Sequence, residues 1–466
     1  MAGISFTLGQ NMTRPGVYNR YEQRADTLFA GASDGIAACA LNSDWGELGK
    51  VREITDMRQA QEAFGNGTEV IRQLLAGGAQ VVYAVRAGSG GKLASGTLKG
   101  AGGASAISIS ARCPGTRALK YALADGGEGV RTFSVLEDGM LLERFSFAAG
   151  GDEAAALIKA AAGSLYLKLE AVPEYSEGGA LMIATETALS GGQQPTATAA
   201  DYASALNLLT GYAWNCVCAD SDSDDVRQAL CAYVKSASED GHMGFAVIGE
   251  GVAVALDERI AHARAMNDRR VVYVGGGWYE GADALVDGWR AAARVAGMIA
   301  CVPCNRSLTH RLIEGGTRCA EALTNARYVA CTQAGMLTFS PTPAGLVWIE
   351  NAITTLNSPA ADDDRGWMKI KRARIRFELM DRACATISPM VGNVSNDDDG
   401  RAAVVQALQG LLRNMTSEGK LLGDARVSVD ASTPPGGDSA AFIIEANDVD
   451  ALEKVYFTYR FSFSQA

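Results

Sequence analysis

The stretch GFAVIGEGVAVALDERIAHARAMNDRRVVYVGGG (Gly244–Gly277) decides the fold class of this chain. The short apolar runs GFAVIGE and RRVVYVGGG at its two ends are predicted strands. The segment Leu256–Asn267 between them is a predicted helix, and Asp283–Ala300 is a second one. Strands that alternate with helices in this way form a largely parallel sheet with helices on both faces. We therefore expect an α/β fold.

Composition divides the rest of the chain into further parts. Residues 181–352 continue the alternation, and residues 27–90 share it, so we interpret them as the N-terminal part of the same α/β core. Residues 91–180 are instead rich in Gly, Ser and Ala in short alternating runs. Within them Asp138 and Gly139 separate two apolar runs, which is the usual sequence of a tight hairpin. This stretch predicts an inserted β-rich domain, a β-sandwich or barrel.

Residues 353–453 predict an α+β domain. The segment Lys369–Ile387 has the pattern of a basic amphipathic helix, and Gly400–Leu422 predicts a second helix. The acidic run NDDDG (Asn396–Gly400) opens that second helix, where an N-cap and nearby carboxylates are stabilising. Two predicted strands, ARVSVD and AAFIIEAN, follow. In all, we expect an α/β multidomain protein.

Net charge and hydropathy argue against several partners. The chain has 466 residues and a formal net charge of −11, whereas a nucleic-acid-binding protein needs a basic surface to neutralise phosphates. The opening residues MAGISFTLGQNM lack the basic and apolar regions of a secretory signal. No run of about 18 apolar residues could cross a membrane. We therefore expect a protein that begins as a soluble cytosolic chain, with neither a membrane nor direct nucleic acid as its partner.

Two motifs resemble metal sites but depart from them. CVPC, with Cys301 and Cys304, has zinc or redox spacing, yet no second such pair and no spaced histidine pair accompanies it. We interpret the ten cysteines as reduced, mostly buried thiols. The run DSDSDD (Asp220–Asp225) resembles half of a calcium loop, but Asp225 occupies its glycine position and Cys231 the position of its bidentate glutamate. A solvated loop or helix N-terminus is the favoured interpretation.

Nucleotide and hydrolase motifs are also incomplete. In VVYVGGGWYEG, Glu280 stands at the third glycine position of a dinucleotide fingerprint, and no P-loop sequence occurs. GASDG matches the nucleophile elbow GxSxG with Ser33 as the nucleophile. Only three histidines could supply its base: His242, His262 and His310. An α/β hydrolase built on Ser33 and His242 is the alternative to a non-enzymatic role, and we expect neither cofactor nor metal.

Both ends of the chain carry strands without an evident partner. The closing sequence EKVYFTYRFSFSQA (Glu453–Ala466) alternates apolar and polar side chains, the pattern of a half-buried strand. We name residues 454–466 the C-terminal arm and residues 1–26 the N-terminal arm. Such a strand is satisfied when it joins the sheet edge of another subunit, and a head-to-tail link of this kind generates rings or open helical polymers. The side chains predicted to make this exchange are Ile4, Phe6, Leu8, Tyr18, Val455, Phe457, Tyr459, Phe461 and Phe463.

The predicted basic helix presents a row of cations. Its members are Lys371, Arg372, Arg374 and Arg376. In a chain this acidic, we expect these cations to meet carboxylates on a neighbouring protein surface. Nucleic acid is the alternative that the net charge disfavours.

Six segments, taken in order, resemble the contractile tail sheath proteins of phages and phage-derived particles. The resemblance extends over nearly the whole chain, and each segment is similar to a landmark of that family, from its N-terminal arm to its C-terminal end. The segments are NMTRPGVYNRYE, DWGELGKVREIT, RRVVYVGGG, AARVAGMIACVPCNRSLTHR, AITTLNS and PPGGDSAAFIIEANDVDALEKVYFTYRF.

The resemblance implies a fold and a set of partners. The family's middle domain is subtilisin-like in fold but not a protease, and the β-rich insertion would lie outermost. Sheath subunits stack as hexameric rings into a helical sleeve around a rigid inner tube, and their arms reach into the C-terminal domains of neighbours. The expected partners are therefore other copies of this chain, the inner tail tube protein, and baseplate and tail terminator proteins. The basic row would contact a neighbour or the tube.

The resemblance also implies a mechanism. The sleeve assembles in the bacterial cytoplasm in an extended, high-energy state, and a baseplate signal lets it contract and drive the tube through a cell envelope. No nucleotide is needed, in agreement with the missing P-loop. The expected location is a virion tail or a tail-like particle. The sequence leaves open whether that particle is a phage tail or a headless bacteriocin or injection system.

Overall fold

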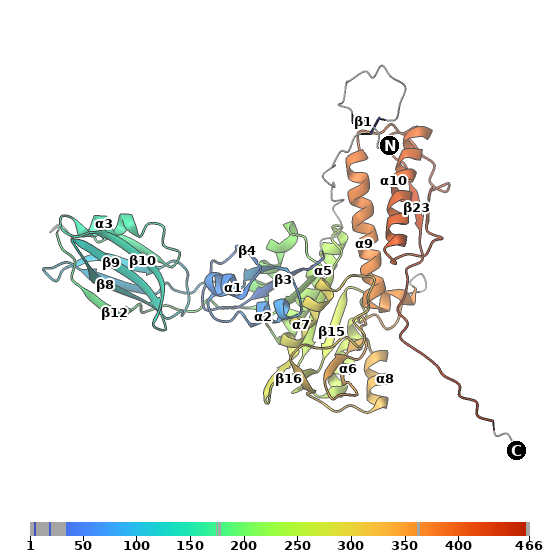
Figure 1. Cartoon of the computed structure of the whole chain (residues 1–466), viewed down its shortest axis with the longest axis horizontal. Coiled ribbons are helices and arrows are strands. Elements are labelled where there is room, and N and C mark those ends of the chain that lie inside the picture. Colours follow the sequence, from blue (N-terminus) through green and yellow to red (C-terminus); the bar gives the residue numbers. More distant parts are fainter. Residues whose placement is uncertain are drawn as a thin grey trace.

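The computed structural model describes residues 34–173, 175, 179–360 and 364–462, and the backbone of two short strands, β1 (Ile4–Ser5) and β2 (Tyr18–Asn19), which pair in parallel. Figure 1 shows a β-rich module at one end, an α/β core in the middle, and a C-terminal helical part from which the last residues extend away. Four residues named from the sequence lie outside the described residues: Phe6, Leu8, Ser33 and Phe463.

A seven-stranded sheet forms the centre of the core. Its order is β19-β15-β14-β13-β3-β5-β4, and every neighbouring pair is parallel except β4 and β5. The parallel sheet predicted from Gly244–Gly277 is thus confirmed. The strands are β3 (Ile36–Leu41), β4 (Val51–Ile54), β5 (Val81–Arg86), β13 (Cys216–Ala219), β14 (Phe245–Glu250), β15 (Val271–Gly275) and β19 (Met336–Leu337).

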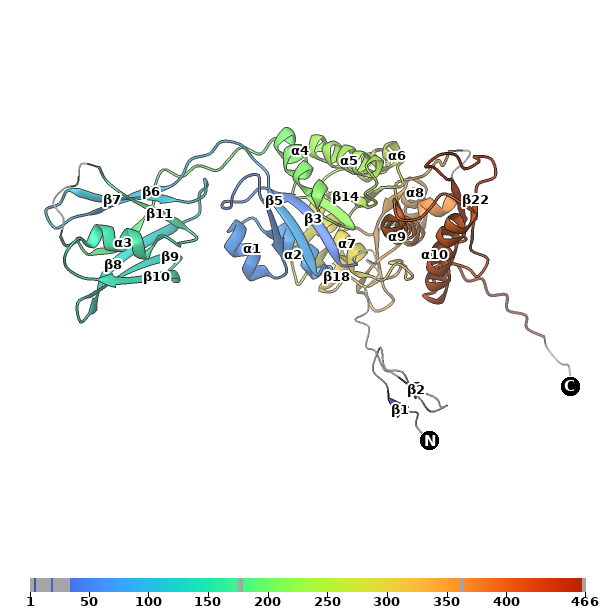
Figure 2. The same cartoon turned by 90° about the horizontal axis from the view of Figure 1, so that it is seen from above.

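Helices cover both faces of this sheet (Figure 2). One layer contains α1 (Met57–Phe64), α2 (Glu69–Ala76) and α7 (Gly288–Cys301), and the other contains α4 (Ala199–Asn207), α5 (Asp224–Glu239), α6 (Leu256–Met266) and α8 (Asn325–Gln333). The backbones of α2 and α7 are in direct contact, since a Cβ on Gly297 would lie 2.1 Å from the Leu74 carbonyl oxygen. Only glycine fits that contact.

Helix α7 begins later than the sequence predicted. Residues Ala284–Asp287 form strand β17, which pairs antiparallel with β16 (Gly277–Glu280), so the helix starts at Gly288. Gly288 has φ of 55°, and a Cβ there would lie 2.5 Å from an Asp222 oxygen, so glycine makes the strand-to-helix turn. The pairing with β16 overrides the helical pattern of the sequence. The remaining short elements of this region are β18 (Gly316–Cys319), β20 (Phe339–Pro341), β21 (Val347–Ile349), η1 (Leu208–Gly211) and η2 (Arg365–Met368).

The β-rich module consists of two antiparallel sheets and helix α3 (Glu153–Ala160) around one apolar core. The tight hairpin predicted at Asp138 and Gly139 is confirmed: both residues have positive φ, and they join β9 to β10. The sheets are β10-β9-β8-β12 and β11-β7-β6, with strands β6 (Ser95–Lys99), β7 (Ser105–Ala111), β8 (Leu119–Gly127), β9 (Val130–Glu137), β10 (Met140–Ala148), β11 (Leu167–Ala171) and β12 (Ala184–Ala188).

The module is joined to the core by two adjacent chain segments. Bridges between Ser89 and Thr196 and between Lys92 and Gln193 hold these segments side by side. The buried guanidinium of Arg86 donates to the carbonyl oxygens of Ser43 and Pro114, at 2.6 and 2.7 Å. Because Arg86 ends a core strand and Pro114 belongs to the module, these bonds tie the two parts together.

Two long helices and a hairpin form the C-terminal part. They are α9 (Ile370–Ile387), α10 (Asp398–Ser417), β22 (Arg426–Val429) and β23 (Phe442–Glu445), with η3 (Ser388–Met390) between the helices. Asp397 caps α10 by accepting from the Gly400 amide at 2.8 Å, which confirms the predicted N-cap. Among the described residues, no helix is long and apolar enough to cross a membrane.

Candidate assembly site at the C-terminal arm

The C-terminal arm extends away from the body of the chain (Figure 1). Phe457, Tyr459 and Phe461 are 75%, 75% and 89% exposed. Their ring centroids follow one another at 6.2 and 6.4 Å, so the aromatic groups form a row along the arm. A row of exposed aromatic groups on an extended segment is a typical docking surface for another chain.

The structure gives the arm no sheet within a single chain. Residues 451–462 form neither helix nor strand, and within the described part of the chain no hydrogen bond or ion pair joins Val455–Ser462 to the body. The strand predicted for Glu453–Ala466 is therefore absent over these described residues, because no strand of the same chain lies beside them. For Ile4 and Tyr18 of the N-terminal arm, only the backbone is described.

The residues just before the arm, 447–453, are held firmly, and we name them the arm root. The Leu422 amide donates to the Asn447 carbonyl oxygen at 2.8 Å, and the Val449 amide donates to the Lys420 carbonyl oxygen at 2.9 Å. These bonds attach the root to the segment that follows α10. The chain therefore changes from anchored to free within a few residues.

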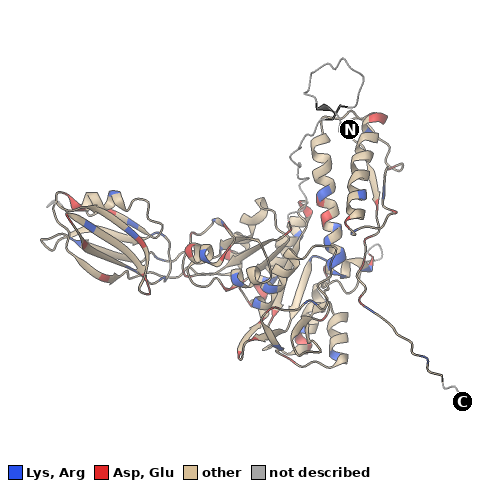
Figure 3. Cartoon of the chain, in the orientation of Figure 1, with Lys and Arg blue, Asp and Glu red and all other residues tan. Residues whose placement is uncertain are grey.

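Ion pairs from α9 and its N-cap residue hold the same root. Figure 3 shows the basic residues of α9 in blue. Arg372 binds Asp448 with both ends of its guanidinium, Nε to Oδ2 at 2.6 Å and Nη2 to Oδ1 at 2.9 Å, and Arg376 Nη2 reaches Asp448 Oδ1 at 2.9 Å. Lys369 Nζ lies 2.8 Å from Asp450 Oδ2 and 2.8 Å from Glu453 Oε2. We name these six residues the root clamp.

Helical spacing explains why the three cations act together. Lys369 is the N-cap residue of α9, and Arg372 and Arg376 follow it at spacings of three and four residues, which places the two arginines on one face of the helix beside Lys369. Burial alone would raise the pKa of Asp448, but hydrogen bonds from Arg372 and Arg376 outweigh burial and hold that pKa below its ordinary value. The Asp448 side chain is only 5% exposed, so solvent screens these pairs weakly.

A third segment also binds the root. Ser307 Oγ and Thr309 Oγ1 donate to Glu453 Oε1 at 3.0 and 2.9 Å. These residues lie in the loop that follows α7, in the motif CVPCNRSLTHR. The structure thus brings together three segments that are far apart in the sequence, and two of them carry the resemblance described above.

Within the single chain, the basic row has partners of its own. Arg372 and Arg376 pair with the Asp448 carboxylate, as described above. Arg374 is buried, donates to the Val302 carbonyl oxygen and lies 3.2 Å from Asp34 Oδ1. Lys371 is buried as well, and burial lowers its pKa. Contacts of these four residues with a neighbour or the tube stay a prediction.

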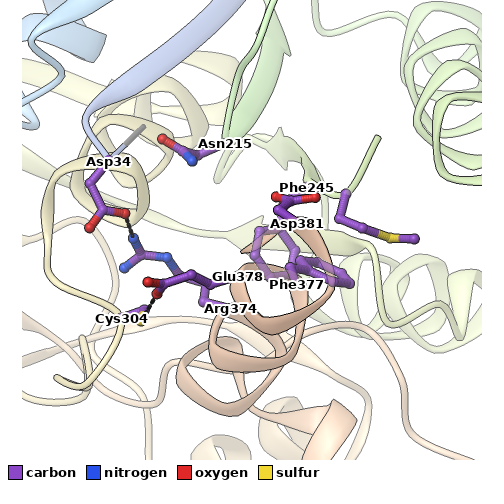
Figure 4. A pocket seen from close by; sticks show the side chains of 9 residues that line it. Asp34, Asn215, Phe245, Cys304, Arg374, Phe377, Glu378 and Asp381 are labelled. Atoms are coloured by element: carbon purple, nitrogen blue, oxygen red, sulfur yellow. Dashed lines mark hydrogen bonds and ion pairs between the residues drawn. The ribbon is translucent and has the colours of Figure 1, made fainter. Parts of the chain in front are cut away.

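A small cavity of about 30 Å³ separates α9 from the core sheet (Figure 4). Cys304 Sγ donates to Glu378 Oε2 at 2.5 Å, and Lys420 Nζ donates to the other oxygen of Glu378 at 2.6 Å. Asp381 lines the same cavity. Burial, together with the neighbouring Glu378 carboxylate, raises the pKa of Asp381 to about 6. The volume is that of one or two water molecules, so this is a joint between parts and not a substrate site.

The hydrolase alternative gains no support from the described residues. Ser33 lies outside them, and His242 Nε2 lies 2.9 Å from the Trp214 carbonyl oxygen, with its ring 4.1 Å from the Trp214 ring. Burial lowers the pKa of His242. His242 is thus held in the packing of the core.

The other two histidines have structural partners too. His262 Nδ1 lies 2.9 Å from Glu250 Oε2, and Arg227 Nη2 lies 2.5 Å from the other oxygen of Glu250. The His310 ring stacks on Trp348 with centroids 4.0 Å apart.

The two metal-like motifs also have other roles. All ten cysteines are free, and six are buried, which confirms the interpretation as reduced, mostly buried thiols. Asp224 and Asp225 lie in the first turn of α5, so the acidic run opens a helix as favoured above. Asp220 accepts from the Tyr202 hydroxyl at 2.6 Å. Within the described ranges, no group of three or more His, Cys, Asp or Glu side chains could hold a metal ion.

The sequence interpretation missed the acidic half of the root clamp. Asp448, Asp450 and Glu453 follow β23 in ANDVDALEK, directly before the arm. The sequence does show a cluster of acidic residues directly before the predicted exchange strand, and it also shows a basic helix. Periodicity could not show that the acidic cluster and the basic helix contact each other.

Comparison with known proteins gives a consistent result. Residues 196–355 match the family described as phage tail sheath protein central domain. No curated protein matches the chain with significance. A sheath tail protein of Desulfitobacterium hafniense has the same fold, with a TM-score of 0.72 and 19% identity over 93% of this chain and 100% of that one. One from Listeria innocua gives a TM-score of 0.68 and 16% identity over 89% and 95%.

An assembled particle gives a third match. The helical sheath of the anti-feeding prophage in its contracted state has a TM-score of 0.56 and 11% identity, over 97% of this chain and 99% of that chain. These identities establish the fold, and the family match covers the middle of the α/β core. Residues 196–355 are therefore similar to the phage tail sheath protein central domain, and the chain shares its fold with the sheath tail protein of Desulfitobacterium hafniense over most of its length.

Proposed function

We propose that this chain is the structural subunit of a contractile sheath. It polymerises helically around a rigid inner tube by exchanging terminal strands, and it contracts from a metastable extended state to drive the tube through a cell envelope. The proposal rests on the C-terminal arm. Its aromatic row is exposed, whereas the arm root directly before it is firmly anchored.

Energetics support exchange between subunits. Burying the five apolar side chains Val455, Phe457, Tyr459, Phe461 and Phe463 contributes on the order of 7–15 kcal/mol before the cost of ordering the arm. A donated arm links each subunit to the next in a head-to-tail manner, which builds rings or helices and not closed dimers. The contracted sheath of the anti-feeding prophage, which has a similar fold, is helical.

The finer features follow from the family resemblance and belong to the proposal. The middle domain is subtilisin-like and non-catalytic, the β-rich module is a sandwich or barrel that lies outermost, and the chain is not an enzyme. Subunits form hexameric rings, and their partners are the inner tail tube protein and the baseplate and tail terminator proteins. Assembly takes place in the bacterial cytoplasm. The domains are residues 1–26, 27–90, 91–180, 181–352, 353–453 and 454–466.

The energy for contraction is stored in the assembly. Additional subunit contacts form in the contracted state, and a kinetic barrier maintains the extended state until the baseplate releases it. Subunits move as nearly rigid bodies, with the arms as hinges. No nucleotide takes part.

Substitutions on the two faces of the arm test the proposal. Phe457→Ser with Phe461→Ser removes two rings of the aromatic row, and we expect a folded protein that stays monomeric in size-exclusion chromatography. Thr458→Ala with Ser462→Ala is the matched control on the other face and should polymerise like the wild type. Equal polymerisation of both double variants would refute strand exchange through this row.

A further inference from the structure

We infer that the root clamp sets the direction in which the C-terminal arm leaves the subunit, so that Lys369, Arg372 and Arg376 are positioning residues for arm exchange. This inference rests on the proposed function and assigns the clamp a role within it. The arm then pivots at Lys454 and Val455, directly after the last clamped residue.

The arm root is held at two separate points, Asp448 and Glu453, which are five residues apart. One anchor fixes only the position of a chain, whereas two separated anchors also fix its direction. Arg372 holds the first point and Lys369 the second, and Ser307 and Thr309 bind the second point as well.

The contacts of the chain with the body end abruptly after the arm root. Glu453 accepts from two hydroxyl groups and pairs with Lys369. From Val455 to Ser462, no hydrogen bond or ion pair reaches the described residues of the body. A hinge forms where a held segment meets a free one. The pivot therefore lies at Lys454. Substitution of a residue of the root clamp should change the direction in which the arm leaves the subunit.

The root clamp consists of ion pairs between charged side chains and not of apolar packing. The Lys369–Asp450 pair is 29% and 39% exposed, so salt screens it more than the Arg372–Asp448 pair at 23% and 5%. The direction of the arm is therefore set by contacts that respond to substitution of single charges while the core of the domain stays intact.

Trypsin cleavage of the purified full-length chain measures the clamp directly. Lys454 lies next to the clamp and Arg460 lies in the free arm, so cleavage after Arg460 serves as the internal control. In Lys369→Ala and Arg372→Ala we expect cleavage after Lys454 to accelerate about tenfold, because the root opens more often, while cleavage after Arg460 is unchanged. Mass spectrometry of early time points separates the two products.

Conservative and distant variants complete the test. Lys369→Arg keeps a cation within reach of both carboxylates and should restore the wild-type cleavage ratio and polymerisation. Arg58→Ala removes an exposed arginine paired with Glu62 on α1 and should change neither. We expect Lys369→Ala and Arg372→Ala to form shorter or irregular polymers although their circular dichroism is that of the wild type. Should Arg372→Ala fail to fold, Lys369→Ala alone decides.

The outcomes separate this inference from the proposed function. Wild-type cleavage ratios and regular polymers in both alanine variants would overturn the role of the clamp, as long as deletion of residues 454–466 abolishes polymerisation. If the deletion itself polymerises normally, the proposed strand exchange fails as well.

Discussion

The guanidinium of Arg372 grips the carboxylate of Asp448 with two nitrogens, at 2.6 and 2.9 Å, across 76 residues of sequence. Bidentate pairs of this kind are stronger and more directional than single contacts. This pair connects the long helix α9 to the arm root, and the arm that we propose to join subunits begins directly after that root.

Asp448→Asn tests the strength of that connection. We expect the free energy of unfolding to fall by about 2 kcal/mol at pH 7, because two guanidinium groups lose a charged partner. The pKa of Asp448 is lowered in the folded chain, so its contribution is present above the ordinary carboxylate pKa and is lost as the pH falls through the folded value. Urea unfolding at pH 7 and at about pH 3 should show a smaller difference at the lower pH. An equal difference at both values would contradict the assignment.

Asp381→Asn should have the opposite pH dependence. The pKa of Asp381 is raised to about 6, so the folded state binds a proton more tightly than the unfolded state. Its charge therefore destabilises the fold above pH 6, and this cost disappears as the pH falls below the ordinary carboxylate value. We expect the variant to be about 1 kcal/mol more stable at pH 8, after allowance for solvent screening, and equal to wild type near pH 4. A variant that is less stable at pH 8 would refute this view of the cavity.

Two glycine substitutions separate packing from helix propensity. Gly297→Ala places a methyl group 2.1 Å from the Leu74 carbonyl oxygen, so we expect a loss of about 2 kcal/mol or more in unfolding free energy. Gly410→Ala lies in α10 with no atom closer than 4.0 Å to the added carbon, and it should stabilise the chain by about 1 kcal/mol. Thermal unfolding of the two proteins decides, and effects of the same sign would contradict the close packing of α2 and α7.

Ser33→Ala and His242→Ala test the hydrolase alternative. His242 is held by the Trp214 carbonyl oxygen, and burial lowers its pKa, so we expect no activated serine beside it. A fluorophosphonate probe should not label the wild type, and assembled particles that carry Ser33→Ala should contract normally. Labelling that Ser33→Ala abolishes would reopen catalysis.

Local patterns made much of the fold predictable. The alternation of strands and helices around Gly244–Gly277 predicted the parallel sheet, and Asp138 with Gly139 predicted a hairpin that the structure confirms. Each of these signals lies within one short segment. The start of α7 was wrong because a tertiary partner, β16, recruited Ala284–Asp287 into a strand.

Long-range partners were the part that the sequence could not supply. The basic helix was predicted correctly as an element, but its cations were expected to face a neighbour. Within the single chain, Arg372 pairs with Asp448, 76 residues away, and Arg376 pairs with both Asp448 and the nearer Asp364. Charge pattern reveals that a partner is needed and does not reveal where it lies.

Negative-stain electron microscopy of the full-length protein beside the protein lacking residues 454–466 shows whether the C-terminal arm joins the subunits. We expect striated tubes from the full-length chain and folded monomers from the shortened one. Identical tubes from both proteins would show that subunits join without the arm and would refute strand exchange through it.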